Sequence, residues 1–179
     1  MTDQEIAIRS VTAEEAGARC SALSDVLIDC VEGGASVSFM KPLSGEKAEA
    51  FWRRVAQSVA SGERILLVAE YQSSGEIVGT VQLVVGQPEN QPHRADVSKM
   101  LVRHCARRRG IGAALMRAAE DAARAAGKTL LVLDTASSDA ERLYERAGWA
   151  RVGVVPGYAL LPDGRPCDTT YYYKRLGKA

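Results

Sequence analysis

The sequence lacks several features that would assign a chain to a specialised class of protein. Its 179 residues contain only four cysteines and two histidines, and no two cysteines form a C-x-x-C pair. Because this leaves no recognisable zinc spacing, we expect no metal, and free thiols fit the reducing conditions of a cytoplasm. The start has no uninterrupted apolar segment of a signal peptide, and no later apolar run can span a bilayer. We therefore expect a cytoplasmic protein with no membrane partner.

A strong excess of charge of one sign is also missing. The 23 basic and 22 acidic side chains leave a formal net charge of +1, and 46% of the residues are hydrophobic. This composition excludes intrinsic disorder, a collagen-like chain and an overall polycation. The length suits one compact domain over residues 1–179, which can bury about two-thirds of its unfolded surface.

The spacing of apolar residues predicts a mixed α/β chain. In sequence order we expect a strand at 5–11, helices at 12–33 and 44–62, a hairpin of strands at 64–71 and 76–85, a strand at 95–102, a helix at 110–127, a strand at 130–133, a helix at 139–147 and strands near 149–155 and 169–174. The strand, helix, strand order around the long helix predicts a right-handed crossover between parallel strands.

The most informative segment is the glycine-containing turn after the strand at 95–102. Arg107, Arg108 and Arg109 precede Gly110, and Gly112 follows at the start of a helix. Without a Cβ, the glycines let consecutive backbone N–H groups approach a phosphate, and the unpaired amides of the helix start add a positive dipole end. The spacing is neither the dinucleotide fingerprint nor the P-loop, so it predicts a different diphosphate ligand.

Other interpretations of this turn stay open. The glycines can simply start a helix, with the arginines as a solvated surface. A nucleic-acid site fits less well, because the charge is confined to one turn and no RNA-stacking motif accompanies it, so we expect no nucleic-acid partner. Cys105 beside the arginines could be a thiolate nucleophile with His104, but adjacent residues on a strand point to opposite faces.

These residues resemble the GNAT superfamily of acyl-CoA-dependent N-acetyltransferases. Its signature Gln/Arg-x-x-Gly-x-Gly/Ala is met by Arg107-x-x-Gly110-x-Gly112. Along most of its length the chain also resembles the tabtoxin-resistance acetyltransferases, through the segments at 33–40, 94–97, 133–135, 156–158 and 162–165. The resemblance implies the GNAT fold, an α/β architecture with a mixed sheet of about seven strands, helices on both faces and one splayed pair of parallel strands.

The resemblance also implies acetyl-CoA as the cosubstrate, with its pyrophosphate on the glycine turn and its pantetheine arm along the preceding strand. The parallel strands ending near Val102 and Asp134 must then splay and leave unpaired amides. A second family signature, Asn-x-x-Ala-x-x-x-Tyr, occurs here as Ser137-x-x-Ala140-x-x-x-Tyr144. Serine replaces asparagine, and its hydroxyl can still form a hydrogen bond. The implied cofactor-binding residues are Met100, Leu101, Val102, Arg107, Arg108, Arg109, Gly110, Ile111, Gly112, Ala113, Ser137 and Tyr144.

Transfer of an acetyl group from a thioester to an amine needs a base, a donor for the oxyanion and an acid for the departing sulfur. Asp96 is the candidate base, directly or through a water, because strand alternation predicts one shared face for Asp96, Ser98, Met100 and Val102. By resemblance a carboxylate at this place is the base, although the tabtoxin-resistance proteins carry glutamate there. The strand backbone near Leu101 is the expected donor to the thioester oxygen.

Asp134 and Tyr144 complete the predicted catalytic set. Asp134 follows an apolar run at the carboxyl end of a parallel strand, where α/β sheets place their ligands, although it can instead cap the following turn or helix. Two neighbouring carboxylates can raise one pKa and hold a cationic amine. By resemblance, Tyr144 protonates the departing thiolate, and its alternative role is to pack the short helix.

The expected acceptor is a small molecule with a primary amine. The resemblance suggests that the loop at 33–40 and the turn at 156–158 wall its pocket, with Ser36, Phe39, Asp96, Asp134 and Tyr158 as substrate-binding residues. Tabtoxinine-β-lactam is the acceptor that the resemblance names, while an amino acid, a polyamine, an aminoglycoside and a protein terminus stay open. A non-catalytic acyl-CoA sensor is the competing class. The oligomeric state is open, with a homodimer as one option.

Overall fold

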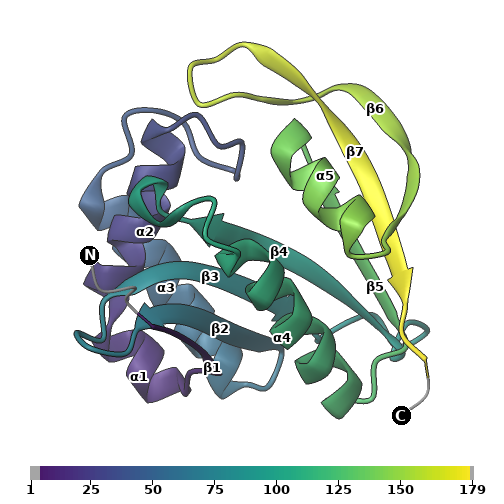
Figure 1. The fold of residues 1–179 in the computed structure, drawn as a ribbon, viewed down its shortest axis with the longest axis horizontal. Coiled ribbons are helices and arrows are strands. Elements are labelled where there is room, and N and C mark those ends of the chain that lie inside the picture. The colour runs from purple at the N-terminus through teal and green to yellow at the C-terminus, as the bar shows by residue number, and fades with distance from the viewer. Residues whose placement is uncertain (1–4, 178–179) are drawn as a thin grey trace.

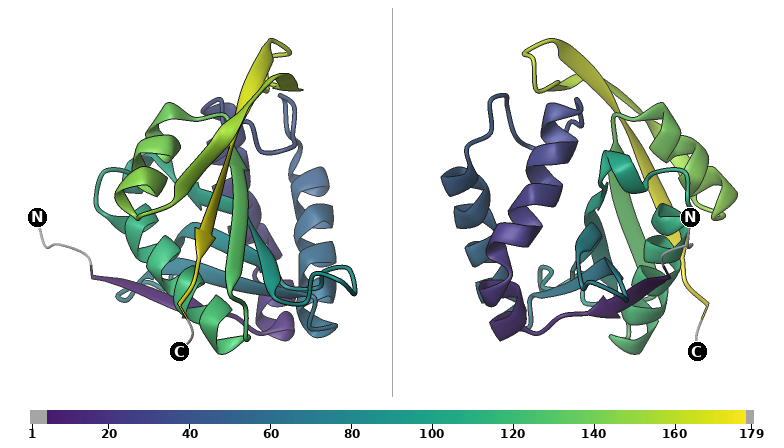
Figure 2. Two further views of the ribbon diagram at one scale, coloured as in Figure 1. Left: turned by 90° about the vertical axis from the view of Figure 1, so that its right-hand side faces the viewer. Right: turned by 60° about the vertical axis from the view of Figure 1, so that its left-hand side comes forward.

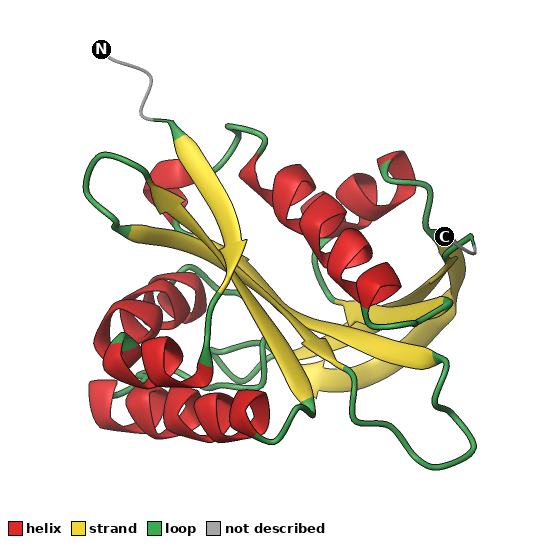
Figure 3. Ribbon diagram, turned by 90° about the horizontal axis from the view of Figure 1, so that it is seen from below, coloured by secondary structure: helices red, strands yellow, loops and turns green. Residues whose placement is uncertain are grey.

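The computed structural model describes residues 5–177, which form one sheet in the order β1-β2-β3-β4-β5-β7-β6 with helices on both faces (Figures 1 and 3). The strands are β1 (Ile6–Ser10), β2 (Arg64–Tyr71), β3 (Ile77–Val84), β4 (Arg94–Val102), β5 (Leu130–Thr135), β6 (Ala150–Leu160) and β7 (Pro166–Arg175). The helices are α1 (Ala13–Ala18), α2 (Cys20–Glu32), α3 (Gly45–Ala60), α4 (Ile111–Ala125) and α5 (Ser138–Arg146), with a short 3-10 helix η1 (His104–Ala106). The predicted α/β class, the seven-stranded mixed sheet and the order of its elements are confirmed.

Side-chain caps begin two of the helices, at the positions 12 and 44 where the sequence predicts helices to start. Thr12 Oγ1 accepts a hydrogen bond from the Glu15 amide at 3.1 Å, and Ser44 Oγ accepts one from the Lys47 amide at 3.2 Å. The single helix predicted at 12–33 is wrong, because the chain breaks at Arg19 into α1 and α2. The Arg19 guanidinium forms an ion pair with the Glu70 carboxylate on β2 at 2.6 Å, so a tertiary contact ties the break to the sheet.

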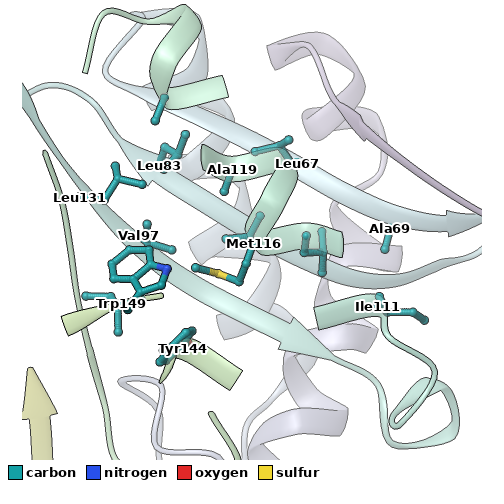
Figure 4. Packing of buried hydrophobic residues seen from close by; sticks show 14 of the residues in the cluster. Leu67, Ala69, Leu83, Val97, Ile111, Met116, Ala119, Leu131, Tyr144 and Trp149 are labelled. Carbon is teal, nitrogen blue, oxygen red and sulfur yellow. The ribbon is translucent and has the colours of Figure 1, made fainter. Parts of the chain in front are cut away.

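Two apolar clusters pack against the sheet, one on each face. On one face α4 and α5 pack on the strands, with Leu115 and Met116 of α4 fully buried and Tyr144 and Trp149 at the side of the cluster (Figure 4). On the other face α1, α2 and α3 bury Trp52 and their own apolar stripes. Helices therefore cover both faces of the sheet, and the strands that carry the site residues are packed from both sides.

The parallel pair β4–β5 opens partway along its length. The registered partners are Arg94 with Leu130, Ala95 with Leu131 and Asp96 with Val132. Within the described chain β4 then continues to residue 102 and β5 to residue 135 without further pairing between them. The predicted splay is therefore confirmed, and it begins directly after Asp96.

A bulge at Lys99 interrupts β4 just beyond this opening. Lys99 has a φ of 49°, and the register with β3 jumps there from Gln82 opposite Ser98 to Thr80 opposite Leu101. Thr80 Oγ1 donates a hydrogen bond to the Lys99 carbonyl at 2.9 Å. A polar side chain that is itself fully buried thus stabilises the backbone of the extra residue.

The bulge reverses which side chains of β4 face which side of the sheet. Val97 before the bulge and Met100 after it both pack into the cluster on the α4 side. The predicted shared face for Asp96, Ser98, Met100 and Val102 is therefore wrong, because one extra residue shifts the alternation. Asp96 and Ser98 lie on the side of α1 to α3.

Two segments, residues 103–106 and 156–158, differ from their predicted local structure. The predicted continuation of the strand through 103–106 is wrong, because the chain turns into η1 after Val102. The predicted turn at 156–158 lies inside β6, as a break in register between Val155 and Ala159. At this break the Gly157 amide donates to Asp168 Oδ1 on β7 at 2.8 Å, which holds the irregular strand to its partner.

A buried ion pair fastens α4 to the end of β7. Glu120 on α4 is only 6% exposed, and Lys174 Nζ donates to its two carboxylate oxygens at 2.7 and 2.8 Å. Trp149 Nε1 donates to the same carboxylate at 3.2 Å. Removal of one partner would leave a buried charge without its counterion, which is costly.

We expect Lys174→Met to lower the free energy of unfolding by about 3 kcal/mol, since the Glu120 charge then stays buried without its main cation. The measurement is urea unfolding followed by circular dichroism. The double variant Lys174→Met with Glu120→Gln should recover part of the loss, and Lys47→Met on the exposed start of α3 is the control. An unchanged midpoint in Lys174→Met would contradict a stabilising role for the pair.

Candidate active site

The glycine turn builds the positive start of α4. Gly110 is the residue before the helix and has a φ of 77°, a left-handed conformation that favours glycine. A Cβ at Gly112 would lie 3.3 Å from Leu143 Cδ2, so glycine there allows α5 to pack closely on α4. The first amides of a helix lack intrahelical partners, so the amides of Ile111, Gly112 and Ala113 are suited to an anion.

The three arginines before Gly110 diverge rather than act together. Arg107 turns back to β4, where its Nε donates to the Val102 carbonyl at 3.0 Å and its Nη1 lies 3.1 Å from His104 Nε2. Arg109 donates to the Tyr71 hydroxyl at 3.1 Å and lies over that ring. Arg108 is exposed with a φ of 61°. Arg107 supports the end of β4 in this structure, and the expected contact of all three arginines with one diphosphate stays a prediction.

His104 connects this turn to α2 through its two ring nitrogens. Because Arg107 can only donate, His104 Nε2 accepts, and the ring proton lies on Nδ1, 3.4 Å from Asp29 Oδ2. The His104 amide donates to the same Asp29 oxygen at 2.8 Å. Cys105 is exposed at the next position. His104 is thus engaged with Arg107 and Asp29, and nothing pairs it with the Cys105 thiol.

The end of β4 offers backbone groups on its open side. Met100, Leu101 and Val102 pair with β3 on one side only, since β5 has already separated from β4. On the β3 side the strands are close, because a Cβ at Gly79 would lie 2.9 Å from the Leu101 carbonyl oxygen. The free side has the form of a strand edge to which an extended ligand can add.

Asp134 lies near the end of β5, opposite Tyr171 on β7. Its Oδ2 accepts a hydrogen bond from Thr169 Oγ1 at 3.4 Å. The alternative of a helix cap is excluded, because Ser137 caps α5 by accepting from the Ala140 amide at 3.3 Å. Ser137 keeps its hydroxyl proton as a donor, since a hydroxyl can accept and donate at once.

The negative charge of Asp134 contributes to a raised pKa at two nearby tyrosines, Tyr144 and Tyr171. Burial raises the pKa of Tyr144 well above its usual value, and the Asp134 charge adds to the rise. The hydrogen bond that Tyr171 donates to the Tyr158 hydroxyl at 2.9 Å raises the pKa of Tyr171 to about 12, with burial and Asp134 as further causes. Both phenols therefore stay protonated at neutral pH, and Tyr144 is a proton donor within electrostatic range of Asp134.

Asp96 lies at the last paired position before the opening. Its Oδ1 forms an ion pair with Arg94 Nη1, and its Oδ2 accepts from Gln87 Nε2 at 3.0 Å. Gln87 in turn accepts from Arg94 Nη2 at 2.6 Å, so the three side chains form a closed network. Each carboxylate oxygen of Asp96 thus accepts one hydrogen bond, and the side chain stays 38% exposed, so a water or a ligand can still reach it.

The two segments that are expected to line the acceptor pocket, the loop after α2 and the β6–β7 hairpin, are joined by hydrogen bonds in the structure. The Ser36 hydroxyl donates to the Leu160 carbonyl at 3.2 Å, and the Lys41 amide donates to the Pro162 carbonyl at 2.9 Å, which joins the loop after α2 to the β6–β7 hairpin (Figure 2). Phe39 packs edge-on against Phe51 of α3 with ring centroids 5.3 Å apart. Tyr158, about half exposed, is held from β7 by Tyr171.

Three polar residues near these walls were not predicted. Lys99 Nζ donates to Ser38 Oγ at 3.3 Å and lies 5.8 Å from the centre of the Phe51 ring. Arg64 Nη1 donates to Gln82 Oε1 inside the sheet. Arg and Gln in otherwise apolar strands were a signal in the sequence, but the role of Lys99 depends on a bulge that no local pattern predicts.

The described residues contain neither a metal-binding cluster nor a membrane-spanning helix. Among residues 5–177, His, Cys, Asp and Glu form no group of three or more that could hold a metal ion. No helix in the same range has both the length and the apolar character needed to cross a membrane.

Comparison with known proteins agrees with this geometry. The chain is 34% identical over 114 residues to an uncharacterized N-acetyltransferase from the hisH-hisA intergenic region of Azospirillum brasilense, and the match covers 63% of this chain and 65% of that protein. The fold is similar to yncA of Salmonella typhimurium, solved with its cofactor acetyl-CoA, at 18% identity and a TM-score of 0.79 over 98% of this chain and 96% of that one.

A second solved structure with this fold is a GNAT superfamily phosphinothricin acetyltransferase from Sinorhizobium meliloti in complex with acetyl-CoA. It matches at 18% identity and a TM-score of 0.79, over 97% of this chain and 90% of that one. The model of the acetyltransferase (GNAT) family matches residues 36–149, which extend from the loop after α2 to the end of α5. The chain belongs to the GNAT acetyltransferase family.

Proposed function

We propose that the protein is an N-acetyltransferase that moves the acetyl group of acetyl-CoA to a primary amine of a small molecule, in a ternary complex. The observation that carries the proposal is the opening between β4 and β5, with unpaired backbone along β4 and the Asp134 carboxylate on β5. The N-acetyltransferase from Azospirillum brasilense and the two relatives solved with acetyl-CoA support this assignment.

The cosubstrate is proposed to lie along β4 and across the start of α4. The amides of Ile111, Gly112 and Ala113 bind the pyrophosphate with the positive end of the helix, and exposed Arg108 adds charge. Backbone groups of residues 100–102 pair with the pantetheine arm, and one of their amides donates to the thioester oxygen as charge develops on it. The hydroxyl of Ser137 is a further donor to this arm.

Proton transfers are divided among three side chains. Asp96 accepts the proton of the attacking amine, directly or through a bridging water, since Arg94 and Gln87 contact its carboxylate. Asp134 assists by holding the amine. The amine nitrogen forms the new bond to the acetyl carbon as the carbon–sulfur bond breaks. Tyr144, kept protonated by burial, gives its proton to the departing thiolate.

The acceptor is proposed to enter from the side of the sheet that carries α1 to α3. Ser36, Phe39 and Tyr158 wall this entrance. An amino-acid-like toxin is among the small amines proposed as acceptors. A protein amine is the second candidate substrate, and a non-catalytic sensor the competing function.

One experiment tests the proposed function directly. Purified protein is incubated with acetyl-CoA and a panel of primary amines, with alcohols of matched size alongside, and release of free thiol is recorded. Amine-dependent release of thiol is the expected result. Binding of acetyl-CoA without thiol release for any amine would identify a sensor, and preference for the alcohols would contradict N-acetylation.

We expect Tyr144→Phe to lower kcat by about 100-fold with little change in acetyl-CoA affinity, since the variant keeps the ring and removes the proton donor. Thiol release gives kcat, and calorimetry gives the affinity. Tyr172→Phe is the matched control, because Tyr172 is equally buried and its hydroxyl donates to Glu141 and Glu145 instead. A kcat for Tyr144→Phe within twofold of wild type would rule out this role.

We expect Gly110→Ala to weaken acetyl-CoA binding about tenfold, since a side chain at a positive φ costs 1–2 kcal/mol and displaces the amides that follow. Gly127→Ala is the matched control at the opposite end of α4, with a φ of 72° and equally open space for a Cβ. Titration calorimetry measures both. Equal affinities for the two variants would show that the turn at Gly110 does not bind the pyrophosphate.

A further inference from the structure

Two cationic side chains lie on the same side of the sheet as Asp96. Arg64 begins β2, directly opposite Val84, and Val84 lies opposite Asp96 on the next strand. Residues in one such row share a face. Lys99 reaches the same side from the bulge, since its ammonium contacts Ser38 and Phe51. Lys99 therefore lies beside the loop after α2, and Arg64 is near enough for its charge to act on Lys99.

Neither cation has a carboxylate of its own. Lys99 Nζ donates to the Ser38 hydroxyl at 3.3 Å and faces the Phe51 ring, and Arg64 Nη1 donates to the neutral Gln82 amide. Within residues 5–177 neither side chain takes part in a salt bridge. Three other partly buried arginines, Arg9, Arg19 and Arg94, by contrast pair with carboxylates of Glu15, Glu70 and Asp96.

The surroundings disfavour the charge on both side chains. Burial lowers the pKa of Lys99, the nearby charge of Arg64 lowers it further, and only Asp134 acts in the opposite direction. Burial likewise lowers the pKa of Arg64, with Glu63 opposing. Two like charges brought together out of water are unfavourable unless an anion joins them.

Hydrogen-bond donors without partners mark the same place. Arg64 Nε and Gln82 Nε2 are buried, and neither has a hydrogen-bond partner in the described part of the chain. Gln82 is completely buried, so bulk water does not reach its amide. Buried donors in native proteins nearly always have acceptors, so an acceptor is missing at this position.

We propose that Arg64 and Lys99 form a subsite for an anionic group of the acceptor, a carboxylate or a comparable small oxyanion, with Gln82 positioning the guanidinium. The acceptor is then amino-acid-like, with its amine at Asp134 and its anion between the two cations. This inference rests on the proposed acetyl transfer, because it concerns the second substrate of the same site.

The charge distribution explains why a zwitterion suits this site. Asp134 lies within electrostatic range of Lys99, so the negative and the positive part of the proposed site act on each other. A cationic amine is attracted to Asp134, and the anion relieves the repulsion between Lys99 and Arg64. A simple monoamine or a polyamine would leave that repulsion in place and add to it.

The test is a panel in which each standard amino acid is paired with its carboxamide and its decarboxylated amine, assayed by thiol release from acetyl-CoA. At least one amino acid should have a kcat/KM more than 100-fold above both matched compounds. In Lys99→Met and in Arg64→Met, the ratio of kcat/KM for the amino acid to kcat/KM for its matched compounds should fall at least tenfold. The cause should be a higher KM for the amino acid. Lys47→Met, an exposed lysine on α3, should keep the wild-type ratio.

Each other outcome has a defined meaning. If decarboxylated amines or carboxamides are acetylated as well as the amino acids, the anion subsite is wrong while acetyl transfer stands. If no compound causes thiol release although acetyl-CoA binds, the proposed function fails, and the subsite with it. A ratio that stays at the wild-type value in both variants would also overturn the proposal.

Thermal unfolding gives a readout that needs no activity. Because Lys99 is partly buried beside another cation without a counterion, Lys99→Met should raise the melting temperature of the free protein or leave it unchanged. In the presence of CoA and the preferred amino acid, wild type should gain stability and Lys99→Met should gain less. A marked loss of stability in free Lys99→Met would show a structural role instead and overturn the proposal.

Discussion

The separation of β4 from β5 is the constraint on which the rest of the site depends. The two parallel strands share partners only through Asp96 and Val132, and beyond that point each is held by its other neighbour, β3 or β7. A sheet that opens in this way leaves backbone donors and acceptors unpaired, which is costly unless water or a ligand satisfies them. Apolar clusters cover both faces of the sheet around this opening.

Charges of opposite sign are arranged around this opening in a definite order. The start of α4 provides backbone amides for an anion on one side. Asp134 lies on β5 near Tyr144, whose pKa is raised by burial, and Lys99 with Arg64 lies on the side of α1 to α3. In the proposed mechanism, a proton acceptor, a proton donor and two anion-binding regions thus lie around the same opening. The two substrates are proposed to approach from opposite faces of the sheet and meet between the strands.

Several charged side chains have partners that the sequence does not predict, each for a tertiary reason. The Val102 carbonyl and His104 hold the guanidinium of Arg107. Arg94 and Gln87 contact the carboxylate of Asp96. Lys99 was overlooked because strand alternation assumes a regular ladder, and an unpaired extra residue is invisible in the spacing of apolar residues.

The sequence by itself determined the order of the elements, the helix starts near Thr12 and Ser44 and the Gly110 turn with its family signature, and the resemblance that this signature carries implied the opening of the parallel pair. These features depend on the conformational preferences of neighbouring residues and on the spacing of apolar residues, both of which can be read from short segments of sequence. Only the tertiary structure decided the bulge at Lys99, the break at Arg19 and the partners of the charged side chains. Those depend on contacts between residues far apart in the chain, and their energies arise only when the sheet and its helices have assembled.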